Sequence, residues 1–273
     1  MIRRLAVIGV GLIGGSLARA LGAAGEVEEV IGCGRGRENL EKAVSLGVID
    51  SYTHDIGEAV EGADMVFLAV PLGAMEQTFR EMVGKLQTDA VITDGGSAKA
   101  SVIEDCRSAF GELPPGFVPG HPIAGTENSG VEASFPELYK DRRVILTPTE
   151  STSGEALAKV QSMWRICGAN VTTMTVEHHD EVLAATSHLP HMLAFSLVDS
   201  LARMKENDEI FRYAAGGFRD FTRIASSNPV MWRDICVANR KALGEMMNRY
   251  IGEMSELAEL IRDGDGDQLL KIF

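Results

Sequence analysis

The sequence predicts an α/β N-terminal domain with a doubly wound parallel sheet, followed by an all-α C-terminal domain. Up to Thr175, short apolar runs alternate with segments of helical periodicity, as in parallel sheets whose strands are connected by helices. Beyond Thr175 only helical patterns follow. We therefore expect two domains, at residues 1–176 and 177–273, which suits a chain of 273 residues.

Composition and charge restrict the class of protein. The chain is 45% hydrophobic and 24% charged, as in ordinary globular proteins, and its net charge of −13 disfavours a nucleic-acid partner. No apolar run is long enough to span a membrane, and no signal peptide fits ahead of the first strand. The four cysteines are widely spaced without a Cys-x-x-Cys pair, so we expect reduced thiols in a cytoplasmic protein.

A glycine-rich turn follows the first predicted strand, residues 5–8, and precedes a helical segment at 12–21. Its Gly-x-Gly-x-x-Gly pattern suits a Rossmann-type dinucleotide site, because the first glycine allows a tight turn, the second lets a diphosphate approach the backbone and the third lets the helix pack on the strand. The alternative is a glycine-rich turn in an unrelated α/β fold. The predicted cofactor-binding residues of this turn are Gly9, Gly11, Leu12, Ile13 and Gly14.

The second predicted strand, residues 27–33, ends where dinucleotide folds often place an acid that binds the ribose hydroxyls of NAD. Here that position holds Gly34, followed closely by Arg35 and Arg37. Glycine leaves room for a 2′-phosphate and arginine can bind it in a bidentate manner. We therefore expect a preference for NADP over NAD. The alternative is that both arginines are solvated loop charges.

The remaining elements of the N-terminal half complete the alternation. The predicted helices lie at 39–46, 77–86, from about 100, and at 153–167, and the predicted strands at 65–70, 90–94, 117–119, 143–147 and 170–175. Because ligands bind at the carboxyl edge of such sheets, Val70 and Pro71, at the end of one strand, are added to the predicted cofactor site.

Two polar residues follow later strands at the same edge. Ser97 precedes a helix and is either its N-cap or an active-site residue. His121 lies between Gly120 and Pro122, on what we predict to be a constrained loop. Loops at this edge often carry function, so we predict that His121 is a catalytic base. The alternative is a polar loop residue bonded to the backbone.

The C-terminal half contains two long predicted helices. Residues 177–204 form the first, interrupted by Pro190, which cannot donate a backbone hydrogen bond. Residues 239–262 form the second, with an apolar stripe that indicates a core or a subunit interface, and Gly264 ends it. The last residues have room for only a short tail helix.

His188 and His191 flank the proline at i,i+3 and share one helix face. A ligand-binding role competes with two alternatives, histidines satisfied within the core and a metal site. The metal alternative needs a third ligand, for which only His179 or Asp180 are near in sequence. We therefore predict no metal.

Arg219 and Arg223 lie at i,i+4 and, with Arg212 and Arg233, form the densest positive group in this half. Two such arginines suit a small dianionic substrate. The alternative is that they pair with neighbouring carboxylates, Asp220 or Asp234 or glutamates, on a solvated face. Trp232 either packs over a ligand or fills the core.

Five stretches of the sequence are distinctive in combination. They are Gly9-Val-Gly-Leu-Ile-Gly-Gly-Ser16, Asp94-Gly-Gly-Ser-Ala-Lys99, Gly120-His-Pro-Ile-Ala-Gly125, Ser187-His-Leu-Pro-His191 and Gly217-Phe-Arg-Asp-Phe-Thr-Arg-Ile-Ala225. In this order they resemble the prephenate/arogenate (cyclohexadienyl) dehydrogenase family of tyrosine biosynthesis, over nearly the whole chain. The resemblance implies a homodimer formed through the C-terminal helices and a site between a Rossmann domain and a helical domain. It also implies oxidative decarboxylation of prephenate or arogenate with hydride transfer to NAD or NADP.

The resemblance also implies residue roles. His121 takes the proton of the substrate hydroxyl, Ser97 binds the same hydroxyl or orients His121, and Arg223 anchors a substrate carboxylate. The remaining substrate-binding residues implied are His188, His191, Arg219, Trp232, Glu127 and Gly216. The choice between prephenate and arogenate stays open.

Two alternatives compete with this family assignment. One is another NADP-dependent Rossmann reductase, such as a β-hydroxyacid dehydrogenase or an imine reductase. Those enzymes usually rely on a catalytic lysine or a different helical signature, which disfavours them here. The other is a non-catalytic dinucleotide-binding dimer, which would not need Ser97, His121 and Arg223 together.

Overall fold

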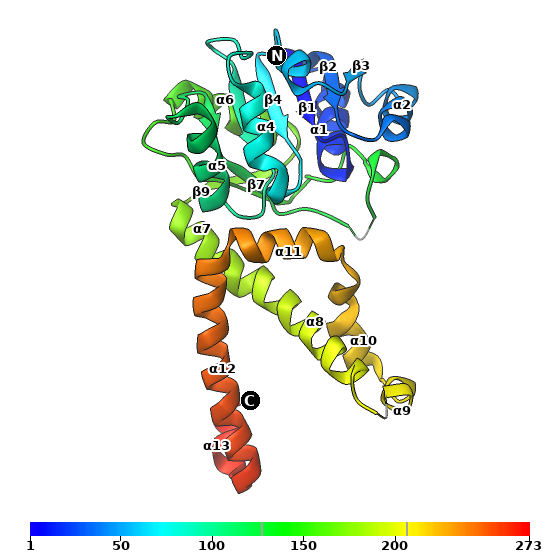
Figure 1. The fold of residues 1–273 in the computed structure, drawn as a ribbon, viewed down its shortest axis with the longest axis vertical. Helices are drawn as coiled ribbons and strands as arrows, with labels where there is room; N and C mark the ends of the chain where they lie inside the picture. Colours follow the sequence, from blue (N-terminus) through cyan, green and yellow to red (C-terminus); the bar gives the residue numbers. More distant parts are fainter. Residues whose placement is uncertain (127, 206) are drawn as a thin grey trace. The chain divides into compact units, whose positions relative to one another are not determined.

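The computed structural model describes residues 1–126, 128–205 and 207–273. The chain divides into two compact units, Met1–His179 and Asp180–Phe273. The first is an α/β unit and the second contains helices, so the predicted fold class is confirmed (Figure 1). The domain boundary predicted after residue 176 lies within helix α7 (Val176–Leu183).

The main sheet of the first unit is parallel and six-stranded, in the order β3-β2-β1-β4-β5-β6. This order reverses between β1 and β4, and ligands of doubly wound sheets bind at such a reversal, beyond the carboxyl ends of the strands. The strands are β1 (Ile2–Ile8), β2 (Val27–Cys33), β3 (Ser51–Thr53), β4 (Met65–Leu68), β5 (Val91–Asp94) and β6 (Phe117–Val118). Most predicted strands are confirmed, and β3 was not predicted.

Helices cover both faces of this sheet (Figure 1). α1 packs against α6, whereas α3, α4 and α5 pack in succession on the opposite face, as right-handed crossovers require. The helices are α1 (Leu12–Ala23), α2 (Arg37–Ser45), α3 (Ile56–Val60), α4 (Met75–Met82), α5 (Ala100–Phe110) and α6 (Gly154–Ile166), with 3₁₀ turns η1 (Leu72–Ala74) and η2 (Val131–Ala133).

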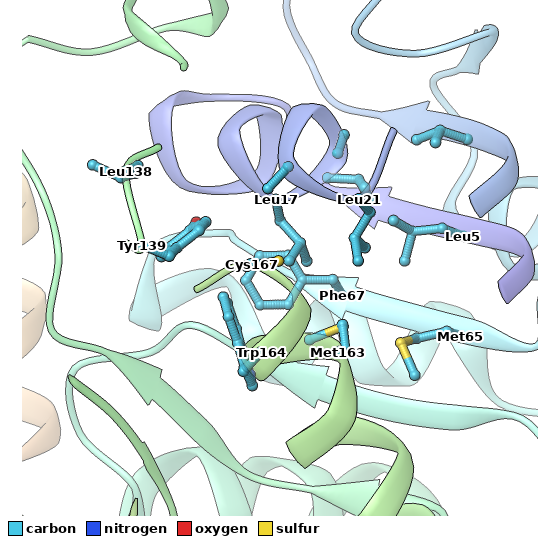
Figure 2. Close-up of a cluster of buried hydrophobic side chains, with 14 of the residues drawn as sticks. Leu5, Leu17, Leu21, Met65, Phe67, Leu138, Tyr139, Met163, Trp164 and Cys167 are labelled. Carbon is cyan, nitrogen blue, oxygen red and sulfur yellow. The ribbon is translucent and has the colours of Figure 1, made fainter. Parts of the chain in front are cut away.

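Aromatic side chains form the centre of the core between α1, α6 and the sheet (Figure 2). Trp164 of α6 lies edge-on to Phe67 of β4, with ring centroids 5.6 Å apart, and to Tyr139, at 4.9 Å. Leu17 and Leu21 of α1 pack over them (Figure 2). Each buried aromatic ring removes a large apolar area from water, so this cluster anchors both helices to the sheet.

A second, three-stranded sheet corrects the expectation that every strand joins the parallel sheet. It consists of β7 (Gly120–Pro122), β8 (Arg143–Leu146) and β9 (Asn170–Thr173), with β7 antiparallel to β8. His121 therefore lies in a strand and not on a loop. The reason is that Pro119 interrupts the chain after β6, and the residues that follow pair with β8, which lies more than twenty residues later.

The second unit continues from α7 through a π-helical turn, η3 (Ala184–His188), into α8 (Leu189–Ala202). The predicted interruption near Pro190 is confirmed, because the backbone N–H of Leu189 bonds to the carbonyl of Ala184, the wider spacing of a π turn. The remaining elements are α9 (Asn207–Arg212), α10 (Gly216–Thr222), η4 (Arg223–Ser226), α11 (Pro229–Ala238), α12 (Arg240–Asp263) and α13 (Gly266–Ile272).

The apolar stripe of α12 is only partly covered within one chain. Leu243, near its start, is buried beside Leu189 of α8, whereas Ile251, Met254 and Ile261 are exposed. None of the helices formed by the described residues combines the length and hydrophobicity that a bilayer crossing requires.

The first prediction concerns the glycines of the turn after β1. A Cβ at Gly14 would lie 2.3 Å from the Gly9 oxygen and 2.7 Å from a Val7 methyl, so Gly14→Ala must displace α1. At Gly11, no atom from another part of the described chain lies within 4 Å of such a Cβ. We expect Gly14→Ala to lower the free energy of unfolding by about 1–3 kcal/mol. Gly11→Ala, the matched control, should change it by less than about 0.5 kcal/mol.

Urea unfolding followed by circular dichroism measures both variants. Equal unfolding midpoints for Gly14→Ala and the unmodified protein would show that the helix can move without cost.

Candidate active site

The glycine turn has the geometry of a diphosphate-binding loop. Gly9 has φ +98°, and a Cβ there would lie 2.4 Å from the Ala69 oxygen, so both backbone angle and space require glycine. Gly14 allows α1 to pack on β1, as described above. Gly11 is the N-cap residue of α1, and no side chain of the described chain caps that helix. Its N-terminal turn is therefore available to an anion, and the residues present fit a dinucleotide.

Side chains from distant segments hold this turn in place. Asn39 of α2 donates from Nδ2 to the Val10 oxygen, at 2.7 Å, and accepts at Oδ1 from the Val131 backbone, at 3.0 Å. The Tyr139 hydroxyl donates to the Ile13 oxygen, at 2.6 Å. Neither Asn39 nor Tyr139 was predicted, because hydrophobic periodicity carries no information on side chains that bond to a distant backbone.

The end of β2 contains the residues predicted to choose the cofactor. A Cβ at Gly34 would meet Leu40 at 3.7 Å, an ordinary contact, so the site has room for a side chain. Arg35 is exposed. Arg37 is the first residue of α2 and lies 3.9 Å from the carboxylate of Glu41, with both side chains exposed. Arg37 is therefore a helix residue beside a carboxylate and not a loop charge, whereas the role of Arg35 stays a prediction.

Other polar groups surround this end of β2. His54 Nδ1 lies 2.7 Å from the Gly34 oxygen, a contact that the sequence did not predict. Burial, and then the negative charges of Asp55 and Glu81, raise the pKa of the Cys33 thiol to about 11. The Cys33 thiol is thus protonated at neutral pH. The carboxylates of Asp55 and Glu81 make the electrostatic potential near the end of β2 more negative.

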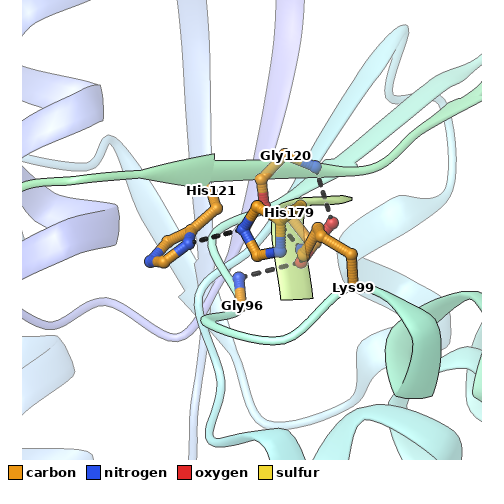
Figure 3. Close-up of polar contacts among 6 residues, drawn as sticks. Gly96, Lys99, Gly120, His121 and His179 are labelled. Atoms are coloured by element: carbon orange, nitrogen blue, oxygen red, sulfur yellow. Dashed lines mark hydrogen bonds and ion pairs between the residues drawn. The ribbon is translucent and has the colours of Figure 1, made fainter. Parts of the chain in front are cut away.

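Asp94, at the carboxyl end of β5, organises the neighbouring turn, in which Gly96 and Lys99 lie (Figure 3). Its buried carboxylate accepts hydrogen bonds from the backbone of Gly96, at 2.8 Å, and of Gly120, at 3.0 Å, and forms an ion pair with Lys99. Lys99 Nζ also donates to the Gly120 oxygen, at 2.6 Å. The first residue of β7 is therefore held at both its N–H and its carbonyl. Asp94 and Lys99 lie at the two ends of one of the distinctive stretches of the sequence, but no role was predicted for either, since charged residues are rarely buried.

His121 follows on β7 and is nearly buried, with 9% of its surface exposed. Its Nδ1 lies 2.9 Å from Nε2 of His179 on α7 (Figure 3). The alternative that His121 is a polar loop residue is wrong, because His121 lies in β7 and its Nδ1 contacts a side chain. His179 had been considered only as a metal ligand. Among the described residues, no group of His, Cys, Asp and Glu side chains could hold a metal ion.

The turn after β5 lies between the glycine turn and the strand that carries His121. A Cβ at Gly95 would lie 3.4 Å from Ile13 of α1 and 3.7 Å from Pro122, the residue after His121. Ser97 lies in the same turn and is half-buried. The N-cap residue of α5 is Lys99, so the alternative that Ser97 caps this helix is wrong. The first unit thus brings Ile13, Ser97 and His121 to one edge of the sheet.

In the second unit, the two predicted histidines lie against Trp232 of α11. His191 stacks on the indole, with centroids 3.7 Å apart and planes at 24°, and His188 lies edge-on at 6.1 Å. Burial lowers the pKa of His191, opposed by the Ser187 carbonyl that lies 2.8 Å from its Nδ1. His191 is therefore a neutral imidazole at neutral pH.

His188 is held by Asn239, whose Nδ2 lies 3.1 Å from His188 Nδ1 and donates to the Asp180 carbonyl. Both histidines therefore have a contact at Nδ1 within the second unit. Their role in ligand binding stays a prediction. Asn239 was not predicted.

The predicted arginines lie on consecutive turns of the second unit. Arg219 belongs to α10, which begins at Gly216, and Arg223 is the first residue of η4. Both are exposed, and neither has an ion-pair partner within the described part of the chain. Arg233 pairs with Asp234 at 2.6 Å, so the alternative of a neutralised charge holds for Arg233 alone. Glu127, also predicted in the substrate site, lies outside the described residues.

Comparison with protein families gives matches over both units. Residues 17–173 match the nucleotide-binding domain of prephenate dehydrogenase, and residues 175–273 match its dimerization domain. A cyclohexadienyl dehydrogenase from Zymomonas mobilis is 41% identical, with 100% of this chain and 93% of that protein covered.

Solved structures of prephenate and arogenate dehydrogenases are similar to this chain over nearly its whole length. Prephenate dehydrogenase from Aquifex aeolicus, in complex with hydroxyphenyl propionate and NAD+, superposes with a TM-score of 0.92 and 38% identity, covering 100% of this chain and 95% of that one. Arogenate dehydrogenase from Synechocystis gives 0.83 and 30%, covering 98% and 95%. The chain belongs to the prephenate dehydrogenase family of NAD(P)-dependent oxidoreductases.

Proposed function

We propose that the protein catalyses the oxidative decarboxylation of prephenate to 4-hydroxyphenylpyruvate, of arogenate to tyrosine, or of both, with NAD(P)+ as hydride acceptor, in tyrosine biosynthesis. The observation that carries the proposal is the placement of His121 in a family member. This histidine lies at the carboxyl edge of a dinucleotide-binding sheet. The turn after β5 lies close both to Pro122, which follows the histidine, and to Ile13 of the glycine-rich turn.

The chemistry requires a base and anion-binding groups. The nicotinamide, when bound, accepts the hydride that leaves the ring carbon bearing the hydroxyl. His121 takes the hydroxyl proton on Nε2, since its Nδ1 is engaged by His179. Ser97 binds the same hydroxyl or orients His121. The ring carboxylate then leaves as CO2, the electrons of the broken C–C bond make the ring aromatic, and the proton held by His121 returns to the phenolate oxygen.

The second unit supplies the proposed substrate-binding residues. Arg223 binds one substrate carboxylate, and Arg219 adds positive charge one helical turn away. The neutral imidazole of His191, which is half-buried and stacks on the buried indole of Trp232, offers a flat surface for the ring. His188, Gly216 and Glu127 complete the proposed set.

We also propose that the active form is a homodimer associated through the C-terminal helices. The match to a dimerization domain over residues 175–273 supports this, as do the apolar side chains Ile251, Met254 and Ile261 exposed on α12. An apolar stripe of this kind is more stable when a partner covers it.

A panel of substrates tests the function. Absorbance at 340 nm is followed with prephenate, arogenate and simple 3-hydroxy acids, each with NAD+ and NADP+. Turnover of prephenate or arogenate is the expected result. Turnover of a 3-hydroxy acid alone would favour the β-hydroxyacid dehydrogenase alternative, which family membership disfavours. Binding of dinucleotide without turnover of any substrate would favour a non-catalytic dimer.

The second prediction concerns the base. His121→Asn should lower kcat by about 10²–10⁴-fold, the usual contribution of a general base. The fold and the dinucleotide affinity should be kept, as checked by fluorescence titration. His178→Asn, an exposed neighbour of His179 on α7, is the matched control and should leave kcat unchanged. Near-normal turnover of His121→Asn would exclude this histidine as the base.

The third prediction concerns substrate anchoring. Arg223→Ala removes a charge-assisted contact made equally in ground and transition states, so KM should rise about tenfold or more while kcat changes little. Arg203→Ala removes an arginine that pairs with Asp199 on the surface of the same unit and should leave KM unchanged. Steady-state kinetics of both variants decide whether Arg223 binds substrate, since an unchanged KM would contradict it.

The fourth prediction is a preference for NADP+ over NAD+ of about tenfold or more in kcat/KM, about 1.4 kcal/mol. Gly34 cannot supply the carboxylate that binds the ribose of NAD, and exposed Arg35 can bind a 2′-phosphate. The nearby carboxylate of Asp55 opposes the phosphate, which limits the size of the preference.

The double variant Gly34→Asp with Arg35→Ser tests this cofactor assignment. It should move the preference toward NAD+, and a Cβ at position 34 makes only an ordinary contact with Leu40. Arg37→Ser alone is the control, because Arg37 is already paired with Glu41. Equal or better kcat/KM with NAD+ in the unmodified protein would show that Arg35 is a solvated loop charge.

A further inference from the structure

The contact between His121 and His179 restricts where protons can lie. His121 Nδ1 and His179 Nε2 are 2.9 Å apart, with ring planes at 64°, and His179 is fully buried. Each neutral imidazole has one N–H donor and one nitrogen acceptor. Two neutral rings can therefore share this contact in only two ways, according to which ring supplies the proton between them.

Only one of these arrangements is compatible with a base at His121. If His179 donated, the single proton of neutral His121 would lie on Nε2, and neither of its nitrogens could accept the substrate proton. If His121 donates from Nδ1, its Nε2 carries the lone pair that a base requires. His179 must then accept on Nε2 and carry its own proton on Nδ1.

We propose that His179 is a positioning residue that fixes the tautomer and the ring orientation of His121, an inference that rests on the proposed function. When His121 acts, the substrate O–H bond breaks and an Nε2–H bond forms, while the Nδ1–H bond of His121 is kept. The resulting imidazolium donates a charge-assisted hydrogen bond to the lone pair of His179, which is stronger than the neutral one. His179 itself takes up no proton.

The backbone around His121 explains why a side-chain partner is needed. Asp94 and Lys99 hold both polar backbone groups of Gly120, so the strand that carries His121 has a fixed position. This fixes the Cα of His121 but not the rotation of its imidazole. His179, anchored by its backbone N–H to the Thr175 carbonyl at the start of α7, constrains that rotation through its contact with Nδ1.

Two substitutions separate hydrogen bonding from packing. The side-chain amide of Gln reaches about as far as Nε2 of histidine and offers an oxygen acceptor, whereas Leu fills similar space without one. We expect His179→Leu to lower kcat by about 10- to 100-fold, as loss of partners that orient metal-binding histidines does. We expect His179→Gln to restore most of this loss. KM should change little in either variant, because His179 does not contact substrate in this proposal.

His178→Leu, at the exposed neighbouring position, is the matched control, and its kcat should equal that of the unmodified protein. Equal kcat for His179→Leu and His179→Gln, whether both are high or both are low, would overturn the proposal, because the acceptor would then make no difference.

A spectroscopic measurement tests the tautomer without using activity. ¹⁵N NMR of the full-length protein at about pH 8, where most imidazoles are neutral, distinguishes Nδ1–H from Nε2–H. His121→Asn assigns the signal. We expect the Nδ1–H tautomer for His121 in the unmodified protein, and a mixture or the Nε2–H form in His179→Leu.

An Nε2–H tautomer of His121 in the unmodified protein would overturn the proposal. The proposed function and the proposed role of His179 are therefore tested by different measurements. Absence of turnover with prephenate and arogenate would contradict the proposed function, whereas the NMR result judges the histidine pair alone.

Discussion

The candidate site depends on one buried carboxylate. Asp94 ends β5 of the parallel sheet, and through the N–H of Gly120 it binds the first residue of β7 in the second sheet. Lys99 neutralises it and bonds the same residue at the carbonyl. Removing one partner of such a buried pair typically costs about 3–5 kcal/mol, because the other charge is left uncompensated. The interaction therefore fixes where the second sheet, and with it His121, begins relative to the turn that carries Ser97.

The three glycines of the first turn differ in what makes them necessary. Gly9 and Gly14 are explained by the protein alone, since a Cβ at either would strike the backbone or a core side chain. Gly11 is not, because within the described chain a Cβ there would meet no atom of another segment. A glycine that packing does not require, placed at an uncapped helix N-terminus, is explained by a ligand that approaches the backbone closely. The unexplained glycine is thus the more informative one about function.

The sequence predicts those features of the fold that depend on interactions between residues close together in the chain. Strand β2 and helix α1 were placed closely, because apolar runs, glycine turns and helical periodicity are local signals. Strand β7 was missed because its pairing depends on β8, which lies far along the chain. His179 was missed because the residues next to it in sequence, His178 and Asp180, are polar, so nothing in the local pattern indicates that this histidine is buried. Long-range pairing and single buried polar groups are properties of the folded chain, not of a sequence window.

The arginines of the second unit fall into two groups, those that form an ion pair with a carboxylate and those for which none is found among the described residues. The protein carries a net charge of −13, and Arg203, Arg233 and Arg249 each lie beside a carboxylate. Arg219 and Arg223 have no such partner among the described residues, although acidic side chains are abundant. At long range the net charge repels a dianion, but this repulsion is screened beyond about 10 Å at ordinary ionic strength. At short range a bidentate arginine contact is stronger than the screened repulsion. An acidic protein can therefore select an anionic substrate, provided that it keeps a few arginines from pairing with its own carboxylates.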